Sequence, residues 1–233
     1  PRPQHERPDH HHDHGEPEPA NHDPPFAHAA SLRERWRSAE GASFFQGMTD
    51  RPHLGAGDIP TAIFPTDNEW GVPLLDLAQQ ASVLEAPFTR WGREKRKSRM
   101  RGTWHFYTED RKFAPLWARP YVMLNSGAVA TVEPNFSVHE QTPRAVALYR
   151  TFQKRYLARL WQEHGLRVMV DLNVSPVHAD LNLLGVPRGW RSYATRGATD
   201  RMAETEREYR LACDRAGTER IVFVVYGGGR RVC

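Results

Sequence analysis

Three apolar runs in the second half of the chain each change to polar residues or glycine at their carboxyl end. They occupy residues 130–135, 168–173 and 222–229. Continuous apolar runs of this length predict strands that are buried on both faces, as in a parallel sheet. The carboxyl ends of parallel strands form a common rim, and ligands bind at that rim in open α/β sheets and barrels. The pattern therefore predicts where a site lies before it indicates any chemistry.

A long helix is predicted between the first two runs, over residues 143–164. Thr142 suits its N-cap, Pro143 suits the first helical position and Gly165 suits the residue after its end. Its apolar side chains fall within one arc, which we expect to pack on the sheet. The arc consists of Ala145, Val146, Tyr149, Phe152, Tyr156, Leu157 and Leu160.

The opposite face of this helix is basic. It carries Arg144, Arg150, Lys154, Arg155 and Arg159. A charged face of this kind is typical of a solvated surface. Arg155 and Arg159 border the apolar arc, so they could reach inward to a carboxylate or a ligand phosphate.

The remaining pattern completes an alternation of strands and helices. A strand is predicted around Trp104 and Phe106, another over 190–195, a helix over 200–216 and a strand over 221–226. The helix over 200–216 is expected to turn Met202, Tyr209, Leu211 and Ala212 inward. Shorter helices are predicted over 30–45 and 74–84. This order predicts an α/β fold with a parallel sheet, in a TIM-like or half-barrel architecture.

Composition divides the chain into a tail and one folded domain. Residues 1–29 are rich in proline, histidine and acids and are expected to be disordered, whereas 30–233 would form a single α/β domain, truncated at its carboxyl end. Residues 1–28 hold six acids and two arginines and so carry about −4, which leaves about +8 for the remainder. That excess predicts an anionic partner such as nucleic acid, a phosphorylated metabolite or acidic lipid. The histidines of 10–14 could capture Zn²⁺ or Ni²⁺, but a solvated tail is the expectation.

Two cysteines, Cys213 and Cys233, cannot build a disulfide framework and lack zinc-site spacing. The expectation is a reduced, cytoplasmic protein. The sequence contains no run of about twenty apolar residues, so no membrane span is predicted.

A basic segment, residues 90–101, precedes the strand at Trp104. Seven cations surround one glutamate, and aromatic residues flank them. Such a segment can neutralise phosphates while an aromatic ring stacks on a base. The candidate nucleic-acid contacts are Arg90, Trp91, Arg93, Lys95, Arg96, Lys97, Arg99 and Arg101. The alternative is a solvated basic loop that leads into the strand.

At the rim, Glu133 and Asp171 are the candidate catalytic residues. Paired carboxylates could share acid and base roles or hold a divalent metal, although no particular cofactor is indicated. Candidate ligand or phosphate contacts are Asn135, Asn173, Arg196, Tyr226, Gly227, Gly228 and Gly229. Glu109 and Asp110 would either join this rim or cap the turn that follows them.

These same residues carry a resemblance to a known family. The segments 102–110, 132–137, 154–162, 170–174 and 225–227 resemble the domain-of-unknown-function family numbered forty-four seventeen, which occurs in phages, plasmids and bacterial genomes. The resemblance covers about residues 70–231. Many members carry aspartate where this chain has Asn135, which argues against an acid or base role at that position. The resemblance implies a mobile-element context and no particular reaction.

Three functional hypotheses follow. The first is a nucleic-acid-associated phage or plasmid protein that binds through residues 90–101. The second is an α/β-barrel-like enzyme that acts on a phosphorylated or nucleotide substrate at the rim. The third is an interaction module without catalysis. The sequence has no P-loop, Rossmann fingerprint, HExxH element or nucleophile motif, so it leaves open whether the protein is an enzyme.

Overall fold

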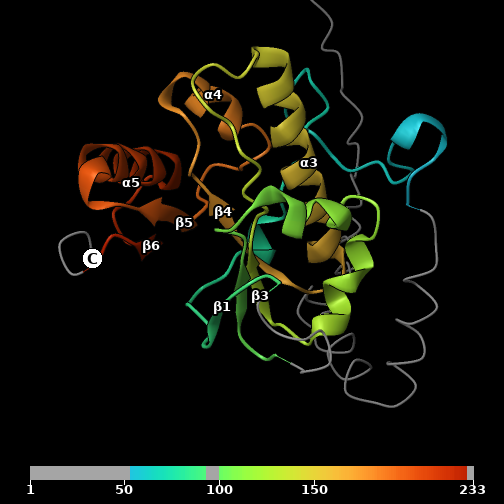
Figure 1. Cartoon of the computed structure of the whole chain (residues 1–233), viewed down its shortest axis with the longest axis horizontal. Helices are drawn as coiled ribbons and strands as arrows, with labels where there is room; N and C mark the ends of the chain where they lie inside the picture. Colours follow the sequence, from blue (N-terminus) through green and yellow to red (C-terminus); the bar gives the residue numbers. More distant parts are fainter. Residues whose placement is uncertain (1–52, 93–99, 230–233) are drawn as a thin grey trace, which may run out of the picture.

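A six-stranded parallel sheet is the centre of the computed structural model, which describes residues 53–92 and 100–229. Each strand pairs with the strand next to it in the sequence, in the order β1-β2-β3-β4-β5-β6 (Figure 1). The strands are β1 (Phe88–Arg90), β2 (Thr103–His105), β3 (Ala130–Val132), β4 (Arg167–Asp171), β5 (Ser192–Gly197) and β6 (Val222–Gly227). The prediction of a parallel α/β half-barrel is confirmed.

The sheet curls until side chains from its first and last strands meet. The rings of Phe88 in β1 and Tyr226 in β6 lie 6.1 Å apart, centroid to centroid. His105 in β2 stacks between them, 4.4 Å from Phe88 and 4.2 Å from Tyr226. Burial and the charge of Arg90 lower the pKa of His105 to about 4, so this ring is neutral at physiological pH. Aromatic side chains of the first, second and last strands therefore pack against one another.

Helices and short turns connect the strands on the outside of the sheet. The helix α3 (Arg144–Glu163) joins β3 to β4, the short helix α4 (Ala179–Asn182) lies between β4 and β5, and α5 (Met202–Ala216) joins β5 to β6. Between β2 and β3 the chain instead forms four 3-10 helices, η3 (Asp110–Lys112), η4 (Ala114–Leu116), η5 (Pro120–Val122) and η6 (Leu124–Ser126). Proline at the first turn of η4 and η5 favours short turns over one continuous helix.

The bounds of α3 are close to those predicted, but its cap and its buried face differ. Gly165 follows the helix with a φ of +78°, as expected for glycine at that position. The N-cap is Pro143, whereas Thr142 accepts a hydrogen bond from the His139 amide. In the first turns Ala147 is buried, but Val146 and Tyr149 of the predicted arc are 44% and 47% exposed. The prediction that the whole apolar arc packs on the sheet is therefore wrong for the start of the helix.

The other predicted helices need correction too. Over 74–84 the structure has only the 3-10 helix η2 (Leu77–Gln79), because flanking backbone groups bond to distant elements. The Leu75 amide donates to the Gly185 carbonyl and the Ala81 amide to the Val168 carbonyl, at 2.8 and 2.9 Å. In α5 the fully inward side chains are Glu208, Ala212 and Ala216, whereas Met202 and Tyr209 are exposed.

Several predictions fall on residues outside the described ranges. These are the tail over 1–29 with its histidines, the helix over 30–45 and most of the basic segment. Within residues 53–92 and 100–229, no helix is both long and apolar enough to cross a membrane.

Candidate functional site

The carboxyl ends of β3 and β4 place Glu133 and Asp171 side by side. Asp171 is the last residue of β4, and Glu133 follows β3 directly. One carboxylate oxygen of Glu133, Oε2, accepts a hydrogen bond from the backbone amide of Asp171 at 3.1 Å. Both side chains are fully buried. The two predicted catalytic residues are thus brought together by neighbouring strands.

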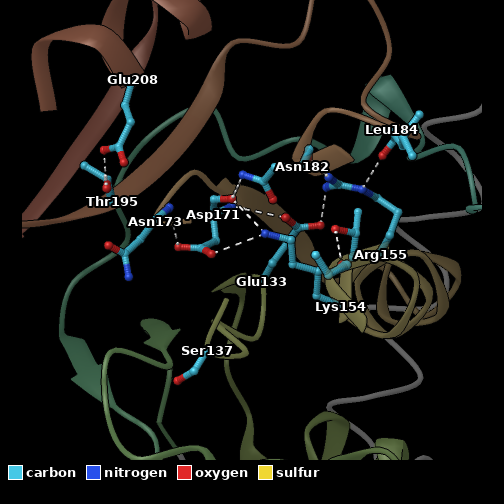
Figure 2. A network of polar contacts seen from close by, with 12 residues as sticks. Glu133, Ser137, Lys154, Arg155, Asp171, Asn173, Asn182, Leu184, Thr195 and Glu208 are labelled. Carbon is cyan, nitrogen blue, oxygen red and sulfur yellow. Dashed lines mark hydrogen bonds and ion pairs between the residues drawn. The ribbon is translucent and has the colours of Figure 1, made fainter. Parts of the chain in front are cut away.

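Two cations from α3 neutralise this pair of acids (Figure 2). Arg155 forms a buried ion pair with Glu133 and donates to the backbone carbonyls of Leu184 and Asn182 at 3.0 and 2.7 Å. Lys154 Nζ lies 3.0 Å from the carbonyl oxygen and 3.3 Å from Oδ2 of Asp171. Four buried charges therefore sum to zero and fasten α3 and the α4 region to the sheet.

This arrangement decides between the two expectations for the basic face of α3. Arg155 reaches a carboxylate, as its position at the edge of the arc allowed. Lys154 was expected to face solvent, and that expectation is wrong, because its side chain is only 4% exposed. Burial of both cations is tolerated because the acids at the strand ends compensate them.

Asp171 also has a perturbed acidity. Burial raises its pKa, the ammonium of Lys154 lowers it, and the nearby Glu133 raises it, with a net upward shift. The backbone amide of Asn173, two residues further on, donates a hydrogen bond to Asp171 Oδ1 at 3.3 Å. The side-chain oxygen of Asn173 accepts a hydrogen bond from Arg201 at 3.2 Å. The predicted ligand residue Asn173 therefore belongs to the same cluster.

Two further residues of this region could not be assigned from the strand-end pattern. The Tyr107 hydroxyl is buried beside Asp171, and its pKa is raised well above normal by burial, by the charge of Asp171 and by a hydrogen bond to that carboxylate. Glu208 in α5 accepts a hydrogen bond from the Thr195 hydroxyl at 2.6 Å, while its other oxygen has no partner within the described ranges. Burial raises the pKa of Glu208 to about 7; the Thr195 hydrogen bond lowers it and Asp171 raises it.

A signal for Glu208 was present in the sequence. It stands four and eight residues before Ala212 and Ala216, so it shares one face of α5 with these two small residues. An acid in line with two alanines that pack inward favours a buried carboxyl.

The other predicted rim residues have different surroundings. Asn135 is buried, and its Oδ1 has no partner among the described residues. The ring of Tyr226 stacks on that of Tyr107, with 5.5 Å between the centroids. Arg196 is exposed. Gly227, Gly228 and Gly229 have φ values of +91°, +81° and +64°, a left-handed run that favours glycine.

Glu109 and Asp110 do not join the cluster. Glu109 forms exposed ion pairs with Arg111 and Lys112. Asp110 accepts hydrogen bonds from the backbone amide and hydroxyl of Ser137, at 3.0 and 2.9 Å. Both acids thus stabilise turns. Across residues 53–92 and 100–229, no three His, Cys, Asp or Glu side chains gather closely enough to hold a metal ion.

Of the basic segment, only its ends are described. Arg93, Lys95, Arg96, Lys97 and Arg99 lie outside the described residues. Trp91 is in the core, with its ring 5.2 Å from Trp104 and 5.8 Å from Phe106, so its faces are covered by protein. Arg90 is half-buried and Arg101 exposed.

Comparison with known proteins places the chain in a family. The model of the family described as "Domain of unknown function (DUF4417)" matches residues 64–209. The Gene 1 protein of Mycobacterium phage D29 is 24% identical over 132 residues, which cover 54% of this chain and 48% of that protein. The Gene 1 protein of Mycobacterium phage L5 is 28% identical over 91 residues, covering 38% of this chain and 40% of that protein. This chain thus matches about half or less of the length of these curated relatives. No solved structure matches it significantly. The chain therefore belongs to the DUF4417 family, a domain of unknown function with relatives in mycobacterial phages.

Proposed function

We propose that this phage-type protein associates with nucleic acid through its basic segment, residues 90–101. The proposal is supported mainly by the lack of ion pairs, among the described residues, at the two arginines that end this segment. Neither Arg90 nor Arg101 forms an ion pair with any described residue. A guanidinium that no acid of the described residues neutralises can neutralise a phosphate.

A neighbouring cation, Lys112, adds positive charge next to the basic segment. A Cβ atom added to Gly92 would lie 3.6 Å from Cβ of Lys112, so the Lys112 side chain lies where the basic segment begins. Lys112 is exposed, and its ion pair with Glu109 spans 3.6 Å. An exposed pair of this kind is weak enough to be exchanged for a phosphate contact.

Replacing Lys95, Arg96 and Lys97 by glutamine in one variant should weaken binding of short DNA and RNA. Each cation that contacts a phosphate releases counterions, so the slope of log K against log salt concentration should fall in magnitude by about 2–3. Fluorescence anisotropy with a labelled oligonucleotide at several salt concentrations measures both quantities.

A matched variant removes three charges elsewhere. Arg188, Arg191 and Arg220 are exposed, and their side chains form no ion pair with any described residue. Their replacement by glutamine should leave the slope almost unchanged. If both triple variants lose the same affinity, only net charge matters and residues 90–101 are not the contact. If the wild-type protein binds no oligonucleotide at low salt, the proposal is wrong altogether.

A second function, an enzyme acting on a phosphorylated or nucleotide substrate at the rim, is favoured by the surroundings of Asp171. Glu208 carries a buried carboxylate oxygen without a partner in the described part of the chain, and the buried Tyr107 hydroxyl lies close to Asp171. A carboxyl with a pKa of about 7 can donate or accept a proton at physiological pH, which general acid–base catalysis requires. In this proposal Arg196 and Gly227–Gly229 would hold the phosphate.

The protonation of Glu208 predicts a pH-dependent stability. Its folded-state pKa is about 7 against an ordinary value of 4.5, so the folded protein binds the proton more tightly than the unfolded chain. The resulting penalty on folding is absent below pH 4.5, grows between pH 4.5 and 7, and is constant above pH 7. Glu208→Gln cannot ionise and should therefore be more stable than wild type by up to about 3 kcal/mol at pH 8.

Chemical unfolding of both proteins at pH 4 and pH 8 measures this difference, which should vanish at pH 4. An equal difference at both pH values would mean that Glu208 does not titrate between them. A thermal-shift panel of nucleotides and sugar phosphates addresses the enzyme proposal, since a bound ligand raises the melting temperature by mass action. A panel without any stabilising compound would contradict it, as would equal stabilisation of the Arg196→Gln variant.

A further inference from the structure

An aromatic ring and a guanidinium are held next to each other on the outer face of α3. The buried amide of Gln153 bridges them: its Oε1 accepts a hydrogen bond from Arg150 at 2.9 Å, and its Nε2 donates to the Tyr149 hydroxyl at 3.3 Å. Tyr149 is 47% exposed, so much of its ring faces solvent. Arg150 forms no ion pair with the described residues, and its guanidinium lies 5.2 Å from the Phe136 ring centroid. Both groups are thus ordered before any ligand binds.

Packing contacts link this pair to the start of the basic segment. Lys112 lies beside Gly92, Phe113 follows Lys112, and the Phe113 ring lies 5.3 Å from that of Phe136, under Arg150. A second aromatic group, Trp117, lies 6.5 Å from Tyr149. The buried rings of Phe113 and Phe136 therefore connect the start of the basic segment to α3 through the core.

We propose that Tyr149 and Arg150 bind one nucleotide of a single-stranded nucleic acid, the base stacked on the tyrosine ring and its phosphate on the guanidinium. The inference rests on the proposed nucleic-acid function and assigns a strand type and a stacking residue to it. An unpaired base offers a free π-face, which a base within a duplex does not. Trp91, which the sequence had suggested for stacking, is covered by the core, so Tyr149 takes that role.

The test compares Tyr149→Ala with Tyr209→Ala in the full chain. Tyr209 is a matched control because it is also an exposed helical tyrosine, 36% accessible, on α5. Tyr149→Ala should raise the Kd for a labelled single-stranded oligonucleotide about tenfold and that for a duplex much less. Tyr149→Phe, which keeps the ring, should stay close to wild type. Tyr209→Ala should bind like wild type.

The outcomes separate this inference from the proposed function. If wild type binds and Tyr149→Ala binds single strands equally well, the nucleotide site on α3 is wrong while the basic segment stands. If wild type binds no nucleic acid, both proposals fail. If Tyr149→Ala changes only self-association in sedimentation, the ring belongs to a protein–protein surface, and this inference is overturned.

Discussion

Arg155→Met should lower the free energy of unfolding by about 3–5 kcal/mol, because it leaves the carboxylate of Glu133 buried without a cation. Methionine keeps an unbranched apolar stem in place of the arginine stem and lacks only the guanidinium end, so the loss reports mainly on charge and hydrogen bonding. Two backbone carbonyls, those of Asn182 and Leu184, also lose their donor. Urea unfolding followed by circular dichroism gives the free energy directly.

Two comparisons make this result specific. Arg144, which is also on α3, forms an ion pair with Asp180 of α4. Both of these side chains are about 60% exposed, so Arg144→Met should lower the free energy of unfolding far less. Adding Glu133→Gln to Arg155→Met removes the uncompensated charge and should recover part of the loss. Equal losses for Arg144→Met and Arg155→Met would show that burial of the pair does not matter.

Gly185→Ala should destabilise the protein by more than about 4 kcal/mol, or prevent folding. Gly185 has a φ of +70°, and a Cβ atom there would lie 2.0 Å from the backbone oxygen of Pro73. That contact is impossible without moving backbone, and the Gly185 carbonyl also accepts the Leu75 amide at 2.8 Å. Thermal and urea unfolding of the purified variant measure the loss.

Gly217→Ala is the control for the backbone conformation alone. Gly217 ends α5 with a φ of +67°, and an added Cβ atom would meet no atom within 4 Å. This substitution should cost about 1–2 kcal/mol, the usual penalty for a left-handed residue with a side chain. If both variants lose the same free energy of unfolding, the close approach between Gly185 and Pro73 does not add to the cost of the substitution.

The sequence predicts the parallel sheet well because parallel strands buried on both faces are apolar throughout. The apolar runs at 168–171 and 222–226 are sufficient by themselves to predict the strands β4 and β6. Strand β1 was missed because three residues are too few to show a period. The connection over 106–129 has no helical period either, and its prolines divide it into 3-10 turns.

The strand-end pattern anticipated part of the clustering in the structure, since Glu133, Asp171 and Asn173 lie together. Hydrophobic periodicity could not find Lys154, because a lysine in a helix is more often solvated than paired inside. It also could not find Tyr107, because the surroundings of that hydroxyl depend on side chains from other strands and helices. Burial of paired charges is a property of the assembled fold.

The strand order has a consequence for how the chain assembles. Because every strand pairs with its neighbour in sequence, each strand–connection–strand unit can dock on the previous one as it leaves the ribosome, and no strand must be threaded between two others. The stretch from Leu75 to Ala81 is different, since its backbone partners, Gly185 and Val168, follow it by about a hundred residues. Closing that long loop is entropically expensive, so this early stretch is expected to join the native structure only after the later strands are in place.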